Sequence, residues 1–263
     1  MSLNKKDINK FHRDGFIIIK NFLTKKEIKK IFTQMDEMIN IPISILSKKK
    51  FKNFDEKYLY LLKKSKKLKS HFYDLTKLLD TVISLGVSKK FTNIGKKLLN
   101  LNTILVESPQ IRADHKLDKR FLPQHQELNK ISKDVITIWV PLVNVDKNGG
   151  GIFLRPKTHK LGHLKFKNSN MSATADSKKR QKTIDTLFSK GELKKYKSIY
   201  PTLNAGDAVV FQTFIFHGTT LNKLNRIRWT YISRFNSINN TPYLKNEKST
   251  MQIPYDADYN KII

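Results

Sequence analysis

From residue 101 onward, the sequence consists of short segments rich in β-branched and aromatic residues, with turn signals between them. The turns include DKNGGG at 146–151 and NAGD at 204–207. Many short strands separated by such turns are typical of a β-sandwich or jelly roll. The segments expected to form strands are NTILVESPQIRA, DVITIWVPLVNV, GIFLRP, DAVVFQTFIFHG and IRWTYISRF.

The first hundred residues have the marks of helices instead. Asn4 with Asp7 resembles a helix start, and Thr24 with Glu27 has the spacing of a capping box. Between these two starts, the run DGFIIIKNF predicts a buried strand.

Further along, apolar residues at three- and four-residue steps predict one helix over 56–80 and a second over 82–100. The lysines of both segments then face solvent. The core-facing stripe of the first helix comprises Leu61, Leu68, Phe72, Leu75 and Leu79.

The length of 263 residues suits one large domain or two small ones. We expect a single domain over 1–263, with a helical buttress at 1–100 and a β core at 101–235. A polar, lysine-rich insertion at 164–197, with one helix near 183–196, interrupts the core. A polar, asparagine-rich tail occupies 236–263.

The sequence contains no cysteine. Disulfides, zinc–thiolate sites, thiol nucleophiles and iron–sulfur clusters are therefore excluded. The longest early apolar run, FIII, is too short to span a bilayer. The charged N-terminus lacks the apolar region of a signal peptide, so we expect a soluble, cytoplasmic protein without a membrane span. The oligomeric state stays open.

The formal net charge is +29, and eight of the 51 basic residues are arginines. Such a charge could mark a surface for nucleic acid or an anionic membrane. However, proteins that read phosphates and bases favour arginine forks and aromatic platforms, whereas here lysine runs are dispersed along helices. Biased composition is the favoured interpretation over a nucleic-acid footprint, and either would attract anionic substrates.

The segment FLPQHQELNKI holds His125 and Glu127 in a chain with 7 histidines. On an extended backbone residues i and i+2 face the same side, so these two side chains project together and Gln126 faces away. An imidazole and a carboxylate on one face can be two ligands of a divalent metal. A third ligand from a distant strand would complete the facial triad of non-haem iron(II) sites.

His217 is the candidate for that third ligand, since it ends the apolar segment DAVVFQTFIF. Arg228 on the following strand offers a guanidinium that binds carboxylates in a bidentate manner. Arg226, two residues earlier, could face the same way and is the second choice for this anchor.

Three stretches of the sequence resemble the phytanoyl-CoA dioxygenase family of iron(II)/2-oxoglutarate oxygenases. They are FHRDGFIIIKNFLTKKEIKKI, FLPQHQELNKISKDVITIWVPLVNVDKNGGGIFLRPKTHKLG and NAGDAVVFQTFIFHGTTLNKLNRIRWTYISRF. They occur in the family's order and cover nearly the whole chain except 164–197 and the tail. The resemblance implies a mainly β fold with N-terminal α-helices around a double-stranded β-helix, a cupin-like jelly roll.

The resemblance also implies roles for individual residues. His125, Glu127 and His217 match the iron ligands, and Arg228 matches the arginine that binds 2-oxoglutarate. Thr219 matches a hydroxyl residue that touches this cosubstrate. Trp139 lies on the strand whose tryptophan flanks it. We expect Arg112, His159 and Arg226 to line the substrate pocket.

Two departures from the family pattern stand out. Glu127 replaces the more common aspartate, so a longer arm must fold back to the metal. PKTHK replaces PGSHK, which removes a glycine from a turn. Halogenating relatives lack the carboxylate altogether, so its presence here favours hydroxylation.

Other histidines and arginines have simpler expected roles. His115 lies in the charged stretch DHKLDKR and is expected to be exposed. Arg155 and Arg234 are expected to make surface or rim contacts.

The resemblance thus predicts a dioxygenase that uses Fe(2+), 2-oxoglutarate and O2 to hydroxylate an unactivated C–H bond of a small molecule. The many lysines favour an anionic substrate. Two alternatives remain: a barrel-fold binding protein without catalysis, and a basic protein associated with nucleic acid.

Overall fold

A computed structural model describes residues 3–118, 121–127, 132, 134–162, 164, 182, 185 and 188–239. Six helices precede most of the strands in the chain. The helices are α1 (Lys5–Asp14), α2 (Lys25–Leu46), α3 (Phe54–Lys64), α4 (Lys66–Thr76), α5 (Asp80–Gly86) and α6 (Lys89–Leu99). Short 3-10 helices follow at η1 (Lys116–Asp118), η2 (Thr158–Leu161) and η3 (Gly191–Lys195).

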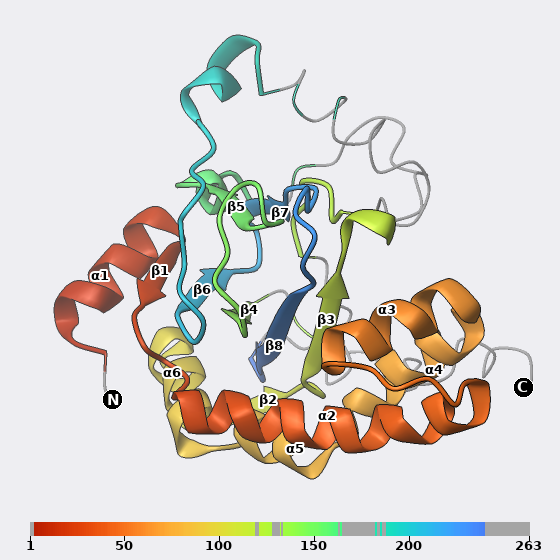
Figure 1. The fold of residues 1–263 in the computed structure, drawn as a ribbon. Coiled ribbons are helices and arrows are strands. Elements are labelled where there is room, and N and C mark those ends of the chain that lie inside the picture. The colour runs from red at the N-terminus through yellow and green to blue at the C-terminus, as the bar shows by residue number, and fades with distance from the viewer. Residues whose placement is uncertain are drawn as a thin grey trace, which may run out of the picture.

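The strands form two antiparallel sheets. A six-stranded sheet has the order β1-β6-β4-β8-β2, with β3 also paired to β8, and a two-stranded sheet joins β5 and β7. Helices cover one side of the large sheet, and the small sheet lies on its other side (Figure 1). The strands are β1 (Phe16–Ile19), β2 (Ile104–Val106), β3 (Gln110–Asp114), β4 (Val135–Pro141), β5 (Ile152–Arg155), β6 (Ala208–Gln212), β7 (Phe216–Thr219) and β8 (Arg228–Ser237). This confirms the predicted fold class.

Alternation along β8 shows how the large sheet separates its two faces. Trp229, Tyr231 and Phe235 pack into the core beneath the helices. Ile232, on the opposite face, packs with the residues between the two sheets. Because side chains alternate along a strand, Arg228 shares this inner face with Ile232. The inner face of the large sheet therefore carries Arg228, which the sequence singled out.

Both predicted helix starts are capping boxes in the structure. The side chains of Asn4 and Thr24 accept from the backbone N–H of Asp7 and Glu27, and those carboxylates accept from the cap N–H groups in return. Each box satisfies two backbone donors that a helix start otherwise leaves unpaired.

The segment 56–100 is helical as predicted, but the prediction of two long helices is wrong, because four shorter helices occupy it. The chain breaks at Ser65, which ends α3 and caps α4, and it breaks again between α5 and α6. The predicted stripe is only partly buried, since Leu61 is fully buried whereas Leu75 is 49% exposed.

The segment boundaries also differ from the expectation. β1 confirms the buried strand predicted in DGFIIIKNF, but it pairs with β6 in the large sheet, so the expected boundary between a helical buttress and a β core does not hold. β8 continues to Ser237, two residues into the expected tail. Much of the insertion and the tail beyond residue 239 lie outside the described residues. Of the described residues near 183–196, Lys182 and Asp185 are helical and Gly191–Lys195 form η3.

Among the described residues, no helix is both long and apolar enough to cross a bilayer.

Candidate metal centre

The HQE segment is held in extended form by β7 and by Thr213, which precedes that strand. His125 and His217 form an isolated antiparallel bridge, with N···O distances of 2.8 and 3.0 Å between their backbones. The backbone N–H of Glu127 donates to the carbonyl of Thr213 at 3.0 Å. Gln126 turns away and donates its amide to the carbonyls of Gly162 and Phe214. The alternation expected from the sequence is therefore present.

The bridge brings the three predicted ligands together. Oε1 of Glu127 lies 3.6 Å from Nε2 of His217 and 4.0 Å from Nε2 of His125. The donor atoms of all three residues lie within 4.8 Å of one another. The side chains of His125 and Glu127 are 13% and 16% exposed, so the cluster is within reach of solvent.

Backbone carbonyls set the tautomer of both imidazoles. Nδ1 of His125 lies 2.8 Å from the carbonyl of Pro123, and Nδ1 of His217 lies 3.1 Å from that of Ile215. A carbonyl only accepts, so each Nδ1 carries the proton and each Nε2 presents its lone pair. Metal-bound histidines are oriented in this way.

The cluster therefore fits a cation. Burial raises the pKa of Glu127, but the Arg234 guanidinium, together with the imidazoles when they are protonated, outweighs it and holds that pKa well below its usual range. The metal-binding form of the site is the one in which both imidazoles are neutral. An ionised carboxylate then faces two nitrogen lone pairs. Mutual repulsion of these donors is relieved by a divalent ion between them, and a His₂–carboxylate set with open positions is typical of non-haem iron(II).

A second polar group lies on the ladder between β3 and β8. Arg228 is 1% exposed and donates to the carboxylate of Asp114, its register partner. Arg112 Nε donates to the same Asp114 oxygen at 3.1 Å. The guanidinium of Arg228 also lies 5.6 Å from the ring of Trp139 on β4. Two arginines and one aspartate leave one positive charge, which one further carboxylate would neutralise.

Arg228 has room and capacity for that carboxylate. Its Nε is buried and has no hydrogen-bond partner among the described residues. A Cβ added to Gly150, whose φ is +79°, would come within 3.4 Å of this Nε. A buried donor without an acceptor is costly, and the absent side chain leaves space beside it. The far carboxylate of a dicarboxylate such as 2-oxoglutarate fits this donor.

Thr219 and Trp139 occupy inner positions near the two groups. Thr219 is two residues after His217 on β7 and thus on the same face, and its hydroxyl accepts from the N–H of Leu122 at 3.0 Å. Trp139 is buried among the residues between the two sheets.

Arg226 and His159 are placed elsewhere. Arg226 is exposed in the turn before β8, because this strand begins at Arg228, so the expectation of a shared strand does not hold. His159 packs over Gly15, and its Nε2 lies 3.0 Å from the carbonyl of His12 on α1. Neither belongs to the three-residue cluster found among the described residues.

Three residues lie in or near the inner polar groups although their sequence context did not place them there. His115 is buried rather than exposed, at 4%. Asp114, the partner of Arg228, was not singled out. Arg234 is not at the surface: its side chain is 17% exposed and its Nη2 lies 3.2 Å from Glu127 Oε1. Its position six residues after Arg228, an even number along one strand, was the available signal.

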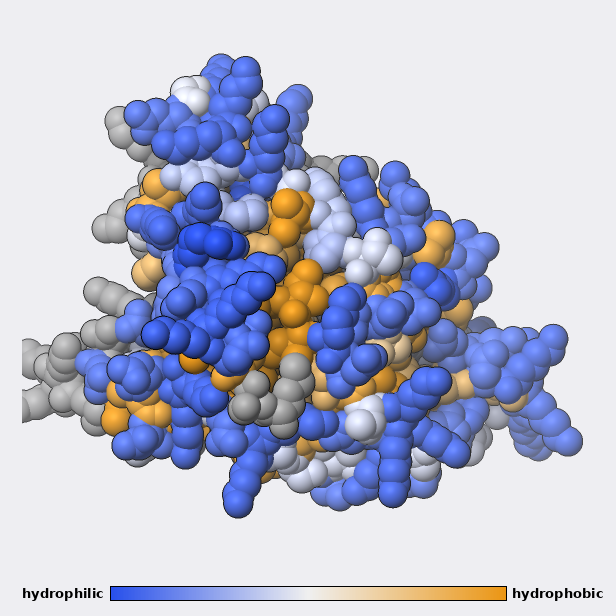
Figure 2. Space-filling model, turned by 90° about the vertical axis from the view of Figure 1, so that its left-hand side faces the viewer, coloured by the Kyte–Doolittle hydropathy of each residue, from blue (hydrophilic) through white to orange (hydrophobic). Residues whose placement is uncertain are grey.

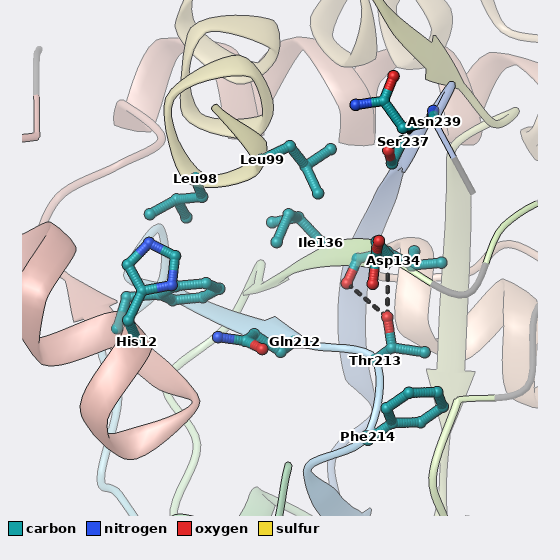
Figure 3. Close-up of a pocket in the computed structure, with 12 residues that line it drawn as sticks. His12, Leu98, Leu99, Asp134, Ile136, Gln212, Thr213, Phe214, Ser237 and Asn239 are labelled. Carbon is teal, nitrogen blue, oxygen red and sulfur yellow. Dashed lines mark hydrogen bonds between the residues drawn. The ribbon is translucent and has the colours of Figure 1, made fainter. Parts of the chain in front are cut away.

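A separate cavity of about 260 Å³ lies where α1 and α6 meet the ends of β4, β6 and β8 (Figure 3). The Thr213 hydroxyl on its wall bonds the backbone N–H and carbonyl of Val135. The carbonyl of Thr213 accepts a hydrogen bond from the backbone N–H of Glu127. Thr213 therefore links the cavity wall to the His–Glu–His cluster. The cavity contains none of the predicted site residues.

The family described as Phytanoyl-CoA dioxygenase (PhyH) matches residues 11–229 of the chain. A search of curated proteins finds no match.

Solved structures of non-haem oxygenases have a similar fold. SnoN, an epimerase solved with Fe3+, alpha ketoglutarate and nogalamycin RO, has a TM-score of 0.62 at 12% identity, covering 89% of this chain and 83% of SnoN. EctD from S. alaskensis, solved with 2-oxoglutarate and 5-hydroxyectoine, has a TM-score of 0.57 at 12% identity, covering 90% and 77%. The non-heme monooxygenase ThoJ has a TM-score of 0.57 at 13% identity, covering 90% and 78%. At these identities the likeness shows the fold.

Proposed function

Because the chain belongs to the phytanoyl-CoA dioxygenase family, we propose that it hydroxylates an unactivated C–H bond of a small, anionic substrate. The prediction of iron and 2-oxoglutarate as cofactors, with dioxygen, is confirmed by the family and by the His–Glu–His cluster. Hydroxylation itself is part of the proposal, because the epimerase SnoN and the carbocyclase SnoK have a similar fold and catalyse other reactions.

In this proposal His125, Glu127 and His217 hold the iron through two Nε2 atoms and one carboxylate. Arg228 binds the far carboxylate of 2-oxoglutarate, with Thr219 and Trp139 beside it. Bound together, iron and 2-oxoglutarate supply the redox chemistry, in which dioxygen oxidises the substrate C–H bond while the cosubstrate becomes succinate and carbon dioxide.

The protein's own contribution is orientation. Carbonyls of Pro123 and Ile215 fix the imidazole tautomers, and the ion pair with Asp114 fixes Arg228. The buried inner face keeps bulk water away from Arg228, where a guanidinium–carboxylate contact is stronger than in water. One observation carries the proposal: three donor atoms from the HQE segment and β7 converge within 4.8 Å.

The test is His217→Ala, assayed for succinate formation in the presence of Fe(II), 2-oxoglutarate and dioxygen. Wild-type protein is expected to form succinate, and the variant is expected to lose this activity because the ion loses a ligand. Near-normal turnover in the variant would reject the triad.

Two further measurements address the alternatives. Anaerobic addition of Fe(II) and 2-oxoglutarate is expected to give a weak visible charge-transfer band, and a binding protein without a metal centre would give none. Tight DNA or RNA binding that persists when His125 and His217 are replaced would instead favour a nucleic-acid role. A screen of acyl-CoAs, amino acids and sugar derivatives for coupled product formation tests hydroxylation and the substrate class.

A further inference from the structure

Arg234 is a largely buried cation beside the His–Glu–His cluster, with its side chain 17% exposed, and it is neither a metal ligand nor the proposed anchor of 2-oxoglutarate. It lies on β8, six residues after Arg228 and on the same inner face. Its Nη2 lies 3.2 Å from Oε1 of Glu127, the carboxylate that faces both histidines. In a chain whose basic residues are mostly lysines, this position holds an arginine.

Arg234 is held in the large sheet through its backbone. Its backbone carbonyl accepts from the N–H of Glu107 at 3.1 Å, and Thr137 on β4 is its register partner on the other side. The carboxylates of Glu127 and Glu107 both attract the guanidinium of Arg234. Glu107 is itself held by the amide of Asn236 at 2.7 Å. Arg234 is thus a fixed cation on a central strand.

A cation at this position can restrict the carboxylate of a glutamate ligand, which is more mobile than that of an aspartate. Glutamate has one more rotatable bond than aspartate, so its carboxylate samples more positions and costs more entropy to confine. A planar guanidinium restricts a carboxylate in both position and orientation. A carboxylate has two oxygens and about four lone-pair directions, so contact with Arg234 is compatible with coordination.

We propose that Arg234 is a positioning residue that holds the carboxylate of Glu127 toward His125 and His217 and so sets the affinity of the centre for its divalent metal. The inference rests on the proposed function, since it assumes that the three residues bind a metal. Arg234 acts through Glu127 and does not itself contact the reacting atoms.

The experiment is a titration of metal-free protein with Co(II), a spectroscopic stand-in for iron(II), followed by its visible d–d absorption. Three variants are compared with the wild type: Arg234→Gln, Arg234→Lys and Arg13→Gln. Arg13 also contacts a carboxylate, Asp14 at 2.7 Å, but its side chain is 63% exposed on α1. It is therefore a matched control for the loss of one arginine–carboxylate contact.

Arg234→Gln is expected to weaken Co(II) binding by about 10- to 100-fold, the usual cost of losing a partner of a metal ligand, and to alter the d–d bands. Arg234→Lys keeps the charge without the fork and is expected to recover part of that loss. Arg13→Gln is expected to match the wild type in affinity and spectrum. Circular dichroism of the metal-free proteins checks that the variants are folded.

The outcomes separate the inference from the proposed function. If the wild type binds no Co(II), both are overturned. If Arg234→Gln binds Co(II) as tightly as the wild type and gives the same spectrum, the positioning role alone is overturned. If Arg234→Gln keeps its Co(II) affinity but has a raised KM for 2-oxoglutarate, Arg234 binds the cosubstrate instead. This result also overturns the positioning role. Should Arg234→Gln fail to fold, unchanged Co(II) binding by Arg234→Lys overturns it.

Discussion

At the scale of single residues, the candidate site depends on contacts behind the functional atoms. The carbonyls of Pro123 and Ile215 direct the two imidazoles, and Asp114 directs Arg228. Each of these partners constrains a side chain that would otherwise have several rotamers. A substitution of one of these partners should therefore weaken the binding of the metal or of 2-oxoglutarate and leave the type of reaction unchanged.

Replacing Arg228 tests the proposed anchor for 2-oxoglutarate. Arg228→Lys keeps a positive charge opposite Asp114 but loses the planar fork, so bidentate binding of a carboxylate is lost. The KM for 2-oxoglutarate is expected to rise at least about tenfold, equivalent to roughly 1.4 kcal/mol, while Co(II) affinity stays within about threefold. Succinate formation over a range of 2-oxoglutarate concentrations measures the first, and a Co(II) titration the second.

Arg226→Lys is the comparison for this variant. Arg226 is exposed in the turn before β8, so its replacement is expected to leave the requirement for 2-oxoglutarate unchanged. An equal rise of KM in both variants would mean that general positive charge, rather than the buried fork of Arg228, attracts the cosubstrate.

The sequence identified the residues with a recognisable spacing and missed those defined by register. His125, Glu127, His217 and Arg228 occur in motif stretches, and the structure brings the first three together. Asp114 becomes a partner of Arg228 only because β3 and β8 pair in one particular register. Such a contact between distant strands leaves no local pattern in the chain.

At the scale of secondary-structure elements, helix starts were predictable and helix breaks were not. Capping is a local interaction within four residues, so Asn4 and Thr24 could be recognised from their neighbours. The apolar repeat across Ser65 continues with nearly helical spacing, so periodicity alone did not reveal that α3 ends there. The same holds for DAVVFQTFIFHG, which divides into β6 and β7 in two different sheets.

Asp207 links the start of β6 to the end of β1 through hydrogen bonds, and its contribution to stability depends on pH. It is 1% exposed and accepts from the N–H groups of Asn21 and Asn204 at 3.0 and 2.9 Å and from Lys20 at 2.8 Å. Burial raises the pKa of Asp207, but these hydrogen bonds outweigh it and lower the pKa below its ordinary value. Ionised Asp207 therefore stabilises the folded protein.

Asp207→Asn is expected to lower the free energy of unfolding at pH 7 by about 1–3 kcal/mol, because an amide has one accepting oxygen and leaves one of the two backbone donors without an acceptor. A depressed pKa contributes stability above the unfolded value of about 4 and loses it as the pH falls through the folded value. The difference between wild type and variant should therefore shrink below about pH 4. Urea unfolding across pH 3–7 measures it.

Lys20→Met is the control for that measurement. The side chain of Lys20 is 60% exposed, so its ion pair with Asp207 is expected to contribute less than about 1 kcal/mol. A larger loss in Lys20→Met than in Asp207→Asn would show that the ion pair, and not the backbone contacts, carries the effect.

At the scale of the whole molecule, one hydrophobic core joins the helices to the large sheet. It includes Phe11 and Met35 from the helices together with Ile138, Val210 and Tyr231 from the strands. Because neither part buries its apolar surface without the other, we propose that residues 1–263 form a single domain.

A single domain predicts one cooperative thermal transition. A metal that binds only the folded protein should raise the Tm, by an amount that grows with concentration as mass action requires. Calorimetry with increasing Co(II) checks both points, and His217→Ala should abolish the shift. Two separate transitions in metal-free protein would contradict the single domain.

The charge of +29 also belongs to the whole molecule. Hydrophilic side chains cover most of the face seen in Figure 2, around a band of apolar residues. Such a surface attracts any polyanion over a Debye length, and this attraction falls steeply with salt. Binding to random duplex DNA is therefore expected to weaken at least about tenfold between 50 and 200 mM salt. Fluorescence anisotropy measures it, and salt-resistant binding would revive the nucleic-acid interpretation.

The bridge between His125 and His217 has one more consequence. An ion held at this point would tie residues 121–127 to β7 across a long closed loop, acting as a staple in a chain that cannot form a disulfide. Chelation would then loosen this stretch first, and its amides would exchange hydrogen faster while the helices stay protected. The ion would then stabilise the attachment of this segment to β7 as well as take part in the reaction.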